Sequence, residues 1–66
     1  MNVNKLKSRL VERGLNVAAL AAELGIHPVT MYAKLNKFEK ITIGEAVKIK
    51  AFLGLTDEEA IEIFLS

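Results

Sequence analysis

The fold of this chain is decided by residues 16–36, NVAALAAELGIHPVTMYAKLN. This stretch predicts a short helix, a break at Gly25 and a second short helix. Gly25 can adopt the left-handed conformation that ends a helix, at a lower cost than a residue with a Cβ. Pro28 suits the first position of the next helix, where its missing N–H would be unpaired anyway. Two helices joined by so short a turn must cross steeply.

Small and apolar residues around this break indicate how the two helices pack. Ala21 has almost no side chain, so the second helix can approach closely. Ile26 can enter the core from the turn, and Met31 and Leu35 are four residues apart on one face of the second helix. Such a pair of helices is typical of the helix-turn-helix that reads duplex DNA. The motif therefore predicts DNA binding, with the second helix in the major groove.

The rest of the chain predicts an all-α fold, a compact bundle of about five short helices with no strand. We expect helices at Asn4–Arg13, Val17–Leu24, Pro28–Asn36, Ile43–Phe52 and Asp57–Leu65. The expected core consists of Leu6, Leu10, Leu20, Leu24, Ile26, Met31, Leu35, Ile49, Leu53 and Ile61.

Polar residues indicate where several of these helices begin. Asn16 is a candidate N-cap for the second helix. Thr42 and Thr56 each precede a glutamate by three residues, which fits the capping box. The acidic residues 57–59 then lie at a helix N-terminus, where negative charge is favourable. We interpret them as stabilising a helix rather than binding a metal.

Length and composition restrict the class of protein. A chain of 66 residues with 52% hydrophobic content is expected to form one domain, residues 1–66, and not to be disordered. The sequence has no cysteine, which excludes disulfides and thiolate chemistry. No apolar run approaches the ~20 residues needed to span a bilayer, and the N-terminal residues lack the apolar region of a signal peptide. We expect a cytoplasmic, nucleoid-associated protein with no membrane partner.

The net charge of +1 hides an asymmetry along the chain. Residues 1–40 contain seven lysines and arginines against three acidic residues, whereas residues 41–66 contain two lysines against five acidic residues. The basic part coincides with the predicted helix-turn-helix. One end is therefore expected to attract a polyanion and the other to repel it. The alternative is that these charges only solvate helix surfaces.

No catalytic or metal site is predicted. His27 is the only histidine, and its place before a proline at a helix start favours an imperfect N-cap or a phosphate contact over a catalytic base. The two serines lie outside nucleophile motifs, and the four glycines are scattered, so no phosphate-binding loop is present. We therefore expect no enzyme, no cofactor and no small-molecule substrate.

Over nearly its whole length the chain resembles the small Cro and repressor-type helix-turn-helix proteins of phages. It is especially similar to Cro-like proteins of Gram-positive phages and mobile elements. The matching pieces are NKLKSRLVERGLN, LAAELGI, TMYAKLN and ITIGEAVKIKAFLGLTDEEAIEIF. The resemblance implies a lambda-repressor-like fold, a double-stranded DNA operator as partner and a role in transcriptional repression.

The chain departs from the pattern of this family at several positions. The family usually has a polar residue that reaches a phosphate where this chain has Val17. It usually has serine, threonine or aspartate at the cap of the recognition helix, where this chain has His27, and polar residues in place of Pro28 and Val29. These departures bear on base reading rather than on the fold.

The resemblance assigns base reading to the N-terminal residues of the second helix of the motif. Carried over by position, the candidates are His27, Pro28, Val29, Thr30 and Ala33. Thr30 can hydrogen-bond to a base edge or a phosphate, whereas Val29 and Ala33 can contact a thymine methyl group.

Phosphate contacts are expected around the same helix. The candidates are Asn16, Tyr32, Lys34, Asn36, Lys37 and Lys40. Residues 36–41, NKFEKI, form a loop that runs beside the DNA backbone in the resembling family, and Phe38 is expected to pack as a lid on the core. Capping alone accounts for Asn16, and Tyr32 can equally pack against the preceding helix.

Three functional interpretations follow from these residues. The first is a sequence-specific, Cro-like repressor. The second is a helix-turn-helix used to bind another protein, such as a partner repressor, which is favoured by Val17, Val29 and the alanine-rich AALAAE segment. The third is a variant with no binding activity. A mobility shift that depends on salt would separate the first from the others.

The C-terminal segment AIEIFLS suggests self-association. Ile61 and either Phe64 or Leu65 are expected to face the core, which leaves Ile63 near solvent in an apolar patch. Because a symmetric operator needs two copies side by side, we expect a weak homodimer that forms mainly on DNA.

Overall fold

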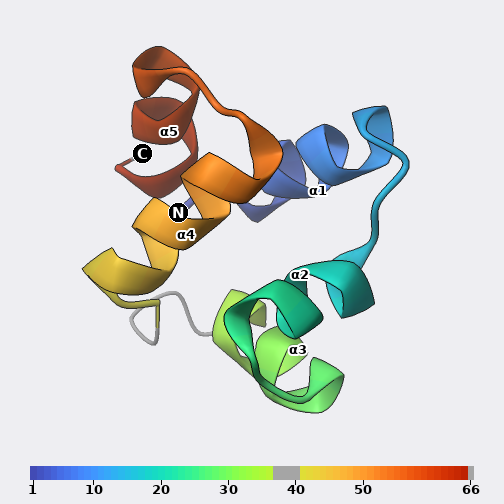
Figure 1. Cartoon of the computed structure of the whole chain (residues 1–66). Coiled ribbons are helices and arrows are strands. Elements are labelled where there is room, and N and C mark those ends of the chain that lie inside the picture. The colour runs from blue at the N-terminus through green and yellow to red at the C-terminus, as the bar shows by residue number, and fades with distance from the viewer. Residues whose placement is uncertain (37–40, 66) are drawn as a thin grey trace.

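The computed structural model describes residues 1–36 and 41–65, and this part of the chain contains helices and no strand. The helices are α1 (Val3–Glu12), α2 (Val17–Leu24), α3 (Pro28–Asn36), α4 (Ile43–Leu53) and α5 (Asp57–Phe64), as Figure 1 shows. The prediction of an all-α fold is confirmed. Helices α2 and α3 have the predicted bounds, and the other three differ from the prediction by one residue at one or both ends.

Side-chain caps explain where most of these helices begin. Asn2 and Asn16 accept hydrogen bonds of 3.0 and 2.9 Å from the backbone N–H groups three residues further on. Thr42 and Thr56 form complete capping boxes with Glu45 and Glu59, as the sequence predicts. Each cap satisfies backbone N–H groups that have no partner inside the helix. The helix starts are therefore encoded by residues next to them in the sequence.

The core is entirely aliphatic apart from one methionine. Its buried members are Leu6, Leu10, Val17, Leu20, Ala21, Met31, Leu35, Ile49, Leu53, Leu55 and Ile63. Most of the predicted core is confirmed, but Leu24 and Ile26 are only partly buried at its edge. None of the described polar or charged residues is buried.

The prediction for the last helix is wrong in its rotation. Ile63 is fully buried, whereas Ile61, expected in the core, is 55% exposed. The reason lies in the contact between α5 and α1. Glu59 and Glu62 pair with cations of α1, and residues three or four apart share a helix face, so Ile63 is turned inward with them. The backbone oxygen of Ile63 also accepts a 2.6 Å hydrogen bond from the N–H of Asn2.

The arrangement leaves α3 at one end of the molecule (Figure 1). Helix α3 packs mainly against α2, α2 packs against α4, and α1 packs against α5. The outer side of α3 therefore has no neighbouring helix among the described elements. None of the described helices combines the length and the apolar character of a membrane span.

Candidate nucleic-acid interface

The turn between α2 and α3 is built as the sequence predicts. Gly25 ends α2 with φ 71°, in the left-handed region. Its N–H donates to the oxygen of Ala22 over 3.1 Å, and the N–H of Ile26 donates to the oxygen of Ala21 over 3.0 Å. A Cβ at Gly25 would meet no atom within 4 Å, so the requirement for glycine is conformational rather than steric. This turn determines the angle at which α3 leaves α2.

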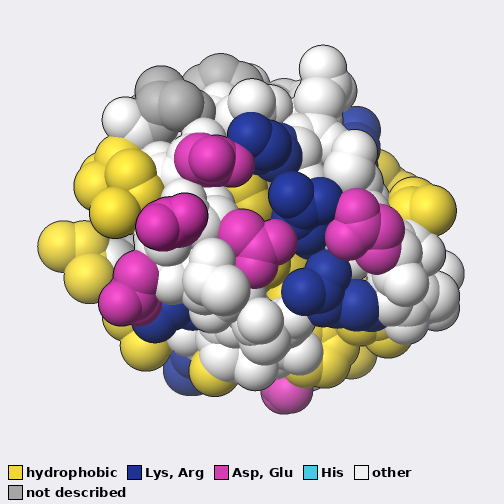
Figure 2. All heavy atoms as spheres, turned by 90° about the horizontal axis from the view of Figure 1, so that it is seen from above, with side chains coloured by type: hydrophobic (Ala, Val, Ile, Leu, Met, Phe, Trp, Pro, Cys, Tyr) yellow, Lys and Arg dark blue, Asp and Glu magenta, His cyan; other side chains and the backbone are white. Residues whose placement is uncertain are grey.

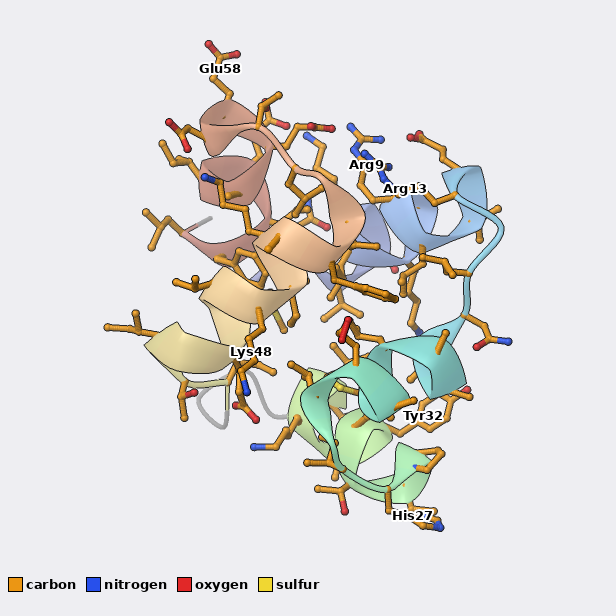
Figure 3. The ribbon with its side chains drawn as sticks, viewed as in Figure 1. Arg9, Arg13, His27, Tyr32, Lys48 and Glu58 are labelled. Atoms are coloured by element: carbon orange, nitrogen blue, oxygen red, sulfur yellow. The ribbon has the colours of Figure 1, made fainter. Side chains whose placement is uncertain are left out.

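His27 caps the start of α3. Its Nδ1 accepts a 3.1 Å hydrogen bond from the N–H of Val29, and its backbone oxygen accepts one of 3.0 Å from Met31. The interpretation as an N-cap is confirmed, with an imidazole nitrogen in place of the usual hydroxyl or carboxylate oxygen. His27 is exposed and lies near the tip of the molecule (Figure 3). A base-reading role for His27 stays a prediction.

The side chains on the outer side of α3 are exposed and lie next to one another. Val29 is 69% exposed and Tyr32 is 51% exposed, and Thr30 and Ala33 are exposed beside them. At 100° per residue these four side chains span an arc of roughly 160°, opposite the buried faces of the helix. We call Val29, Thr30, Tyr32 and Ala33 the α3 face. It contains three of the five base-reading candidates, and Pro28 is partly buried at its edge.

Lys34, a candidate phosphate ligand, is held by a carboxylate. Its Nζ lies 3.2 Å from Oε2 of Glu45, and both side chains are about one-fifth exposed, 20% and 19%. Burial raises the pKa of Glu45, but the backbone N–H of Thr42 and the ammonium of Lys34 together lower it more, so this pKa lies below its ordinary value. The pair joins α3 to α4. A DNA phosphate would therefore have to compete with Glu45 for this lysine.

The start of α2 offers less to a phosphate than the family pattern implies. Asn16 caps the helix through its side-chain oxygen, which accepts from the N–H of Ala19. Val17, where the family usually has a polar residue, is 7% exposed and belongs to the core. The capping role of Asn16 is confirmed, and its phosphate contact stays a prediction.

Two basic residues of α1 are paired with carboxylates of α5. Nζ of Lys5 lies 2.6 Å from Oε2 of Glu62, and Nε of Arg9 lies 2.7 Å from Oε2 of Glu59. The Nε–H of Arg9 does not point at its partner, so this contact is electrostatic rather than an aligned hydrogen bond. Figure 2 shows basic and acidic side chains next to one another on one face. These pairs join cations of residues 1–40 to carboxylates of residues 41–66, which reduces the expected charge difference between the two ends, and the attraction of a polyanion to one end stays a prediction.

One lysine outside the predicted set has a suitable position. Lys48 is exposed on α4, makes no ion pair with any residue that the structure describes, and points from α4 toward α3 (Figure 3). The sequence interpretation missed it because charges were summed along the chain, which placed Lys48 in the acidic half. Asn36 is exposed at the end of α3. Lys37, Lys40 and Phe38 lie outside the described residues.

Nothing in the described part of the chain resembles a metal centre, since residues 1–36 and 41–65 contain no group of three or more potential ligands.

Comparison with protein families gives one result: residues 5–64 match the model of the Cro/C1-type HTH DNA-binding domain. No curated protein and no solved structure matches the chain.

Proposed function

The chain belongs to the Cro/C1-type helix-turn-helix family of DNA-binding domains, and we propose that it is a Cro-like repressor that reads its operator with the α3 face. The observation that carries this proposal is the exposed arc of Val29, Thr30, Tyr32 and Ala33 on a helix that no described element covers. A helix of this kind fits the major groove of B-DNA, which is about 12 Å wide.

Base reading on this face relies on apolar contacts. Val29 and Ala33 present methyl groups, which favour the methyl group of thymine. Thr30 supplies a hydroxyl that both donates and accepts a hydrogen bond, so it can read a base edge. The α3 face has no arginine or glutamine to make a bidentate contact. We therefore expect an operator preference that depends on thymine positions and on few hydrogen bonds.

Phosphate contacts in this proposal come from the margins of the α3 face. Tyr32 can donate its hydroxyl, Asn36 its side-chain amide, and Lys48 its ammonium from α4. Lys37 and Lys40 follow α3 in the sequence and remain candidates. Because Lys5 and Arg9 are paired with α5, they contribute little to attraction of DNA. We expect modest affinity for random duplexes and a shallow dependence on salt.

Selection from a pool of random duplexes, followed by titration at several salt concentrations, tests this proposal. Lys48→Ala should weaken binding to all duplexes alike and reduce the salt slope by about one unit. Thr30→Ala should instead change the preference among the selected sequences. Lys7→Ala, which removes an exposed lysine of α1, is the matched control and should leave both quantities nearly unchanged.

Two results would contradict the proposal. Failure to enrich any sequence, combined with binding that does not respond to salt, would rule out a DNA reader. An equal loss on selected and random duplexes for Thr30→Ala would remove that residue from the base-reading set.

A second candidate function is recognition of another protein through the α3 face. The observation that favours it is the apolar character of this face, where Val29 and Tyr32 are more than half exposed and Lys34 is held by Glu45. Apolar and aromatic side chains with few charges are typical of the centre of a protein interface. Co-purification of one defined repressor, lost in Val29→Lys, together with no sequence enrichment, would favour this function.

Transcriptional repression through a two-fold symmetric operator further requires two copies of the domain, one helical turn apart. We propose that the protein acts as a repressor at the nucleoid and pairs mainly on DNA. A divergently transcribed repressor gene beside its own gene would support a role in a phage lysis–lysogeny switch.

A further inference from the structure

The cap of α3 uses one ring nitrogen of His27 and leaves the other for a partner. Nδ1 accepts a 3.1 Å hydrogen bond from the N–H of Val29. Nε2 makes no hydrogen bond to any residue that the structure describes, and the side chain is exposed. Figure 3 shows His27 at the tip of the molecule, where α3 begins.

The cap also determines the tautomer of the imidazole. In a neutral imidazole one ring nitrogen is a donor and the other is an acceptor. Nδ1 must be the acceptor here, because the N–H of Val29 donates to it. The hydrogen is therefore on Nε2. Since the two nitrogens face different directions from the ring, the Nε2–H group points away from the first turn of α3 while the cap is in place.

A donor held in this way differs from one on a flexible side chain. The hydrogen bond to Val29 restrains the ring, so less side-chain freedom is lost when Nε2–H meets a partner. The common cap residues serine, threonine and aspartate end at the oxygen that makes the cap. At the start of α3, His27 therefore combines a cap with a donor that reaches beyond it.

We propose that His27 determines specificity by donating its Nε2–H to N7 of a guanine in the major groove. Guanine presents N7 and O6 there, two acceptors side by side. Adenine instead presents N7 next to an amino group that donates, and thymine presents O4 next to a methyl group. A ring that offers a donor and no acceptor fits guanine best. This inference rests on the proposed function, because it needs α3 in the major groove.

The surroundings of His27 agree with this role. His27 directly precedes the α3 face, and the N-terminal residues of a recognition helix are those that contact base edges. None of the described carboxylates pairs with His27, in contrast to Lys34, which is held by Glu45. The donor can therefore meet a base without first leaving another partner. His27 adds one guanine position to the thymine positions expected for Val29.

Replacement of guanine N7 by carbon tests the inference from the side of the DNA. Duplexes with the selected half-site are made with 7-deazaguanine at one guanine at a time, and their affinity for the intact protein is measured. One position should lose affinity by about three- to tenfold, the value of one hydrogen bond. The other guanines should show a smaller loss.

A substitution that keeps the cap separates the two roles of the side chain. His27→Ser retains an oxygen that can cap α3 but lacks Nε2–H. It should bind the unmodified half-site about three- to tenfold more weakly and lose nothing further with 7-deazaguanine at the sensitive position. Thr56→Ser makes a similar change at the cap of α5 and is the matched control, which should respond like the wild type. Urea unfolding of His27→Ser should match the wild type, so that weaker binding does not reflect a lost cap.

NMR of the ring nitrogens tests the tautomer in the free protein. His27 is the only histidine, so its signals need no assignment to a residue. At about pH 8, above the range in which free histidine titrates, the hydrogen should be on Nε2 and absent from Nδ1. A hydrogen on Nδ1 would overturn the inference.

The DNA experiments can overturn it independently. A selected half-site without a preferred guanine would do so, as would an equal loss with 7-deazaguanine for wild type and His27→Ser. These results leave the proposed function in place, because a sequence has still been selected. Failure of the proposed function differs: no sequence is then enriched, and binding does not respond to salt.

Discussion

Helices α2 and α3 meet through aliphatic side chains and a glycine turn, whereas α1 and α5 meet through ion pairs placed over buried aliphatic residues. At the α2–α3 contact the buried groups include Ala21 and Met31, both 0% exposed. At the α1–α5 contact the Lys5–Glu62 and Arg9–Glu59 pairs join the two helices, and Ile63 of α5 is fully buried. The difference shows that a charge counted in the sequence is not always available to a partner, because folding has already paired it.

Ion pairing and hydrophobic burial contribute unequally to stability at these contacts. Partly exposed ion pairs contribute about 0–1 kcal/mol each, whereas a fully buried isoleucine contributes several times as much. We therefore expect hydrophobic burial to dominate the stability even at the α1–α5 contact. The ion pairs lie on the same side of α5 as Ile63, so they are compatible with the face that burial turns inward.

The largest effect is expected for Ile63→Ala. Its side chain is fully buried, so truncation should lower the free energy of unfolding by about 2–5 kcal/mol through lost burial and a residual cavity. Ile61→Ala, two residues earlier and 55% exposed, is the matched control and should change it by less than about 0.5 kcal/mol. Urea unfolding of both variants gives the comparison. Equal effects would mean that α5 is rotated differently from the structure.

The next effect is expected at the α2–α3 contact, with Ala21→Leu. Ala21 is 0% exposed, so three extra carbon atoms should force the helices apart at a cost of about 1–3 kcal/mol. Ala22→Leu adds the same atoms at an exposed position of α2 and should be nearly neutral. Thermal unfolding of the two variants separates packing from helix propensity. A wild-type melting temperature for Ala21→Leu would contradict the tight contact.

Gly25→Val tests the turn rather than the packing. The substitution should destabilise the protein by about 1–2 kcal/mol, because a β-branched residue fits a left-handed conformation badly. Gly44→Ala is a control of opposite sign: Gly44 lies inside α4 without positive φ, and its new Cβ would be 3.9 Å from Oγ1 of Thr42. This substitution should stabilise by about 0.4–1 kcal/mol. Urea unfolding that gives both changes the same sign would refute the conformational argument.

The smallest effect is expected from acid at the charged contacts. The backbone N–H of Thr56 and the nearby Arg9 hold the pKa of Glu59 below its ordinary value of 4.5, and Lys50 holds the pKa of Asp57 below 3.8. A carboxylate whose pKa is lower in the folded protein stabilises it above the unfolded pKa. This stability is lost as the pH falls through 4.5 and toward the folded pKa values.

Urea unfolding at neutral and acidic pH measures this dependence. Glu59→Gln should lose part of the dependence on pH and keep most of the stability at low pH. Glu58→Gln, an exposed neighbour in the first turn of α5, is the control and should change the pH dependence less. An identical pH profile for wild type and Glu59→Gln would show that the α1–α5 ion pair does not contribute to stability.

The elements of this fold could be predicted because their signals are local. Gly25, Pro28 and the threonine–glutamate capping boxes act on backbone groups within four residues of themselves, so their effect does not depend on the rest of the chain. The helix bounds followed within one residue. The placement of Met31 and Leu35 in the core followed from helical spacing, since the two residues are four positions apart and therefore share one face of α3.

The candidate site could be predicted only in part. The exposure of Val29, Thr30 and Ala33 follows from their position opposite the buried face of α3. Whether a cation is available does not follow from the sequence, because pairing depends on residues far along the chain. Lys34 meets Glu45 eleven residues later, and Lys48 points toward α3 from another helix.

The sequence by itself therefore determined the helices, their caps, the turn and the family, since each depends on neighbouring residues or on a pattern along the chain. Only the tertiary structure decided the inward face of α5 and the pairing of α1 cations with α5 carboxylates. In AIEIFLS, Ile61 and Ile63 are both apolar and both fit a helix. The choice between them depended on where α1 lay, because the side of α5 that packs against α1 carries Ile63 together with Glu59 and Glu62, which pair with Arg9 and Lys5.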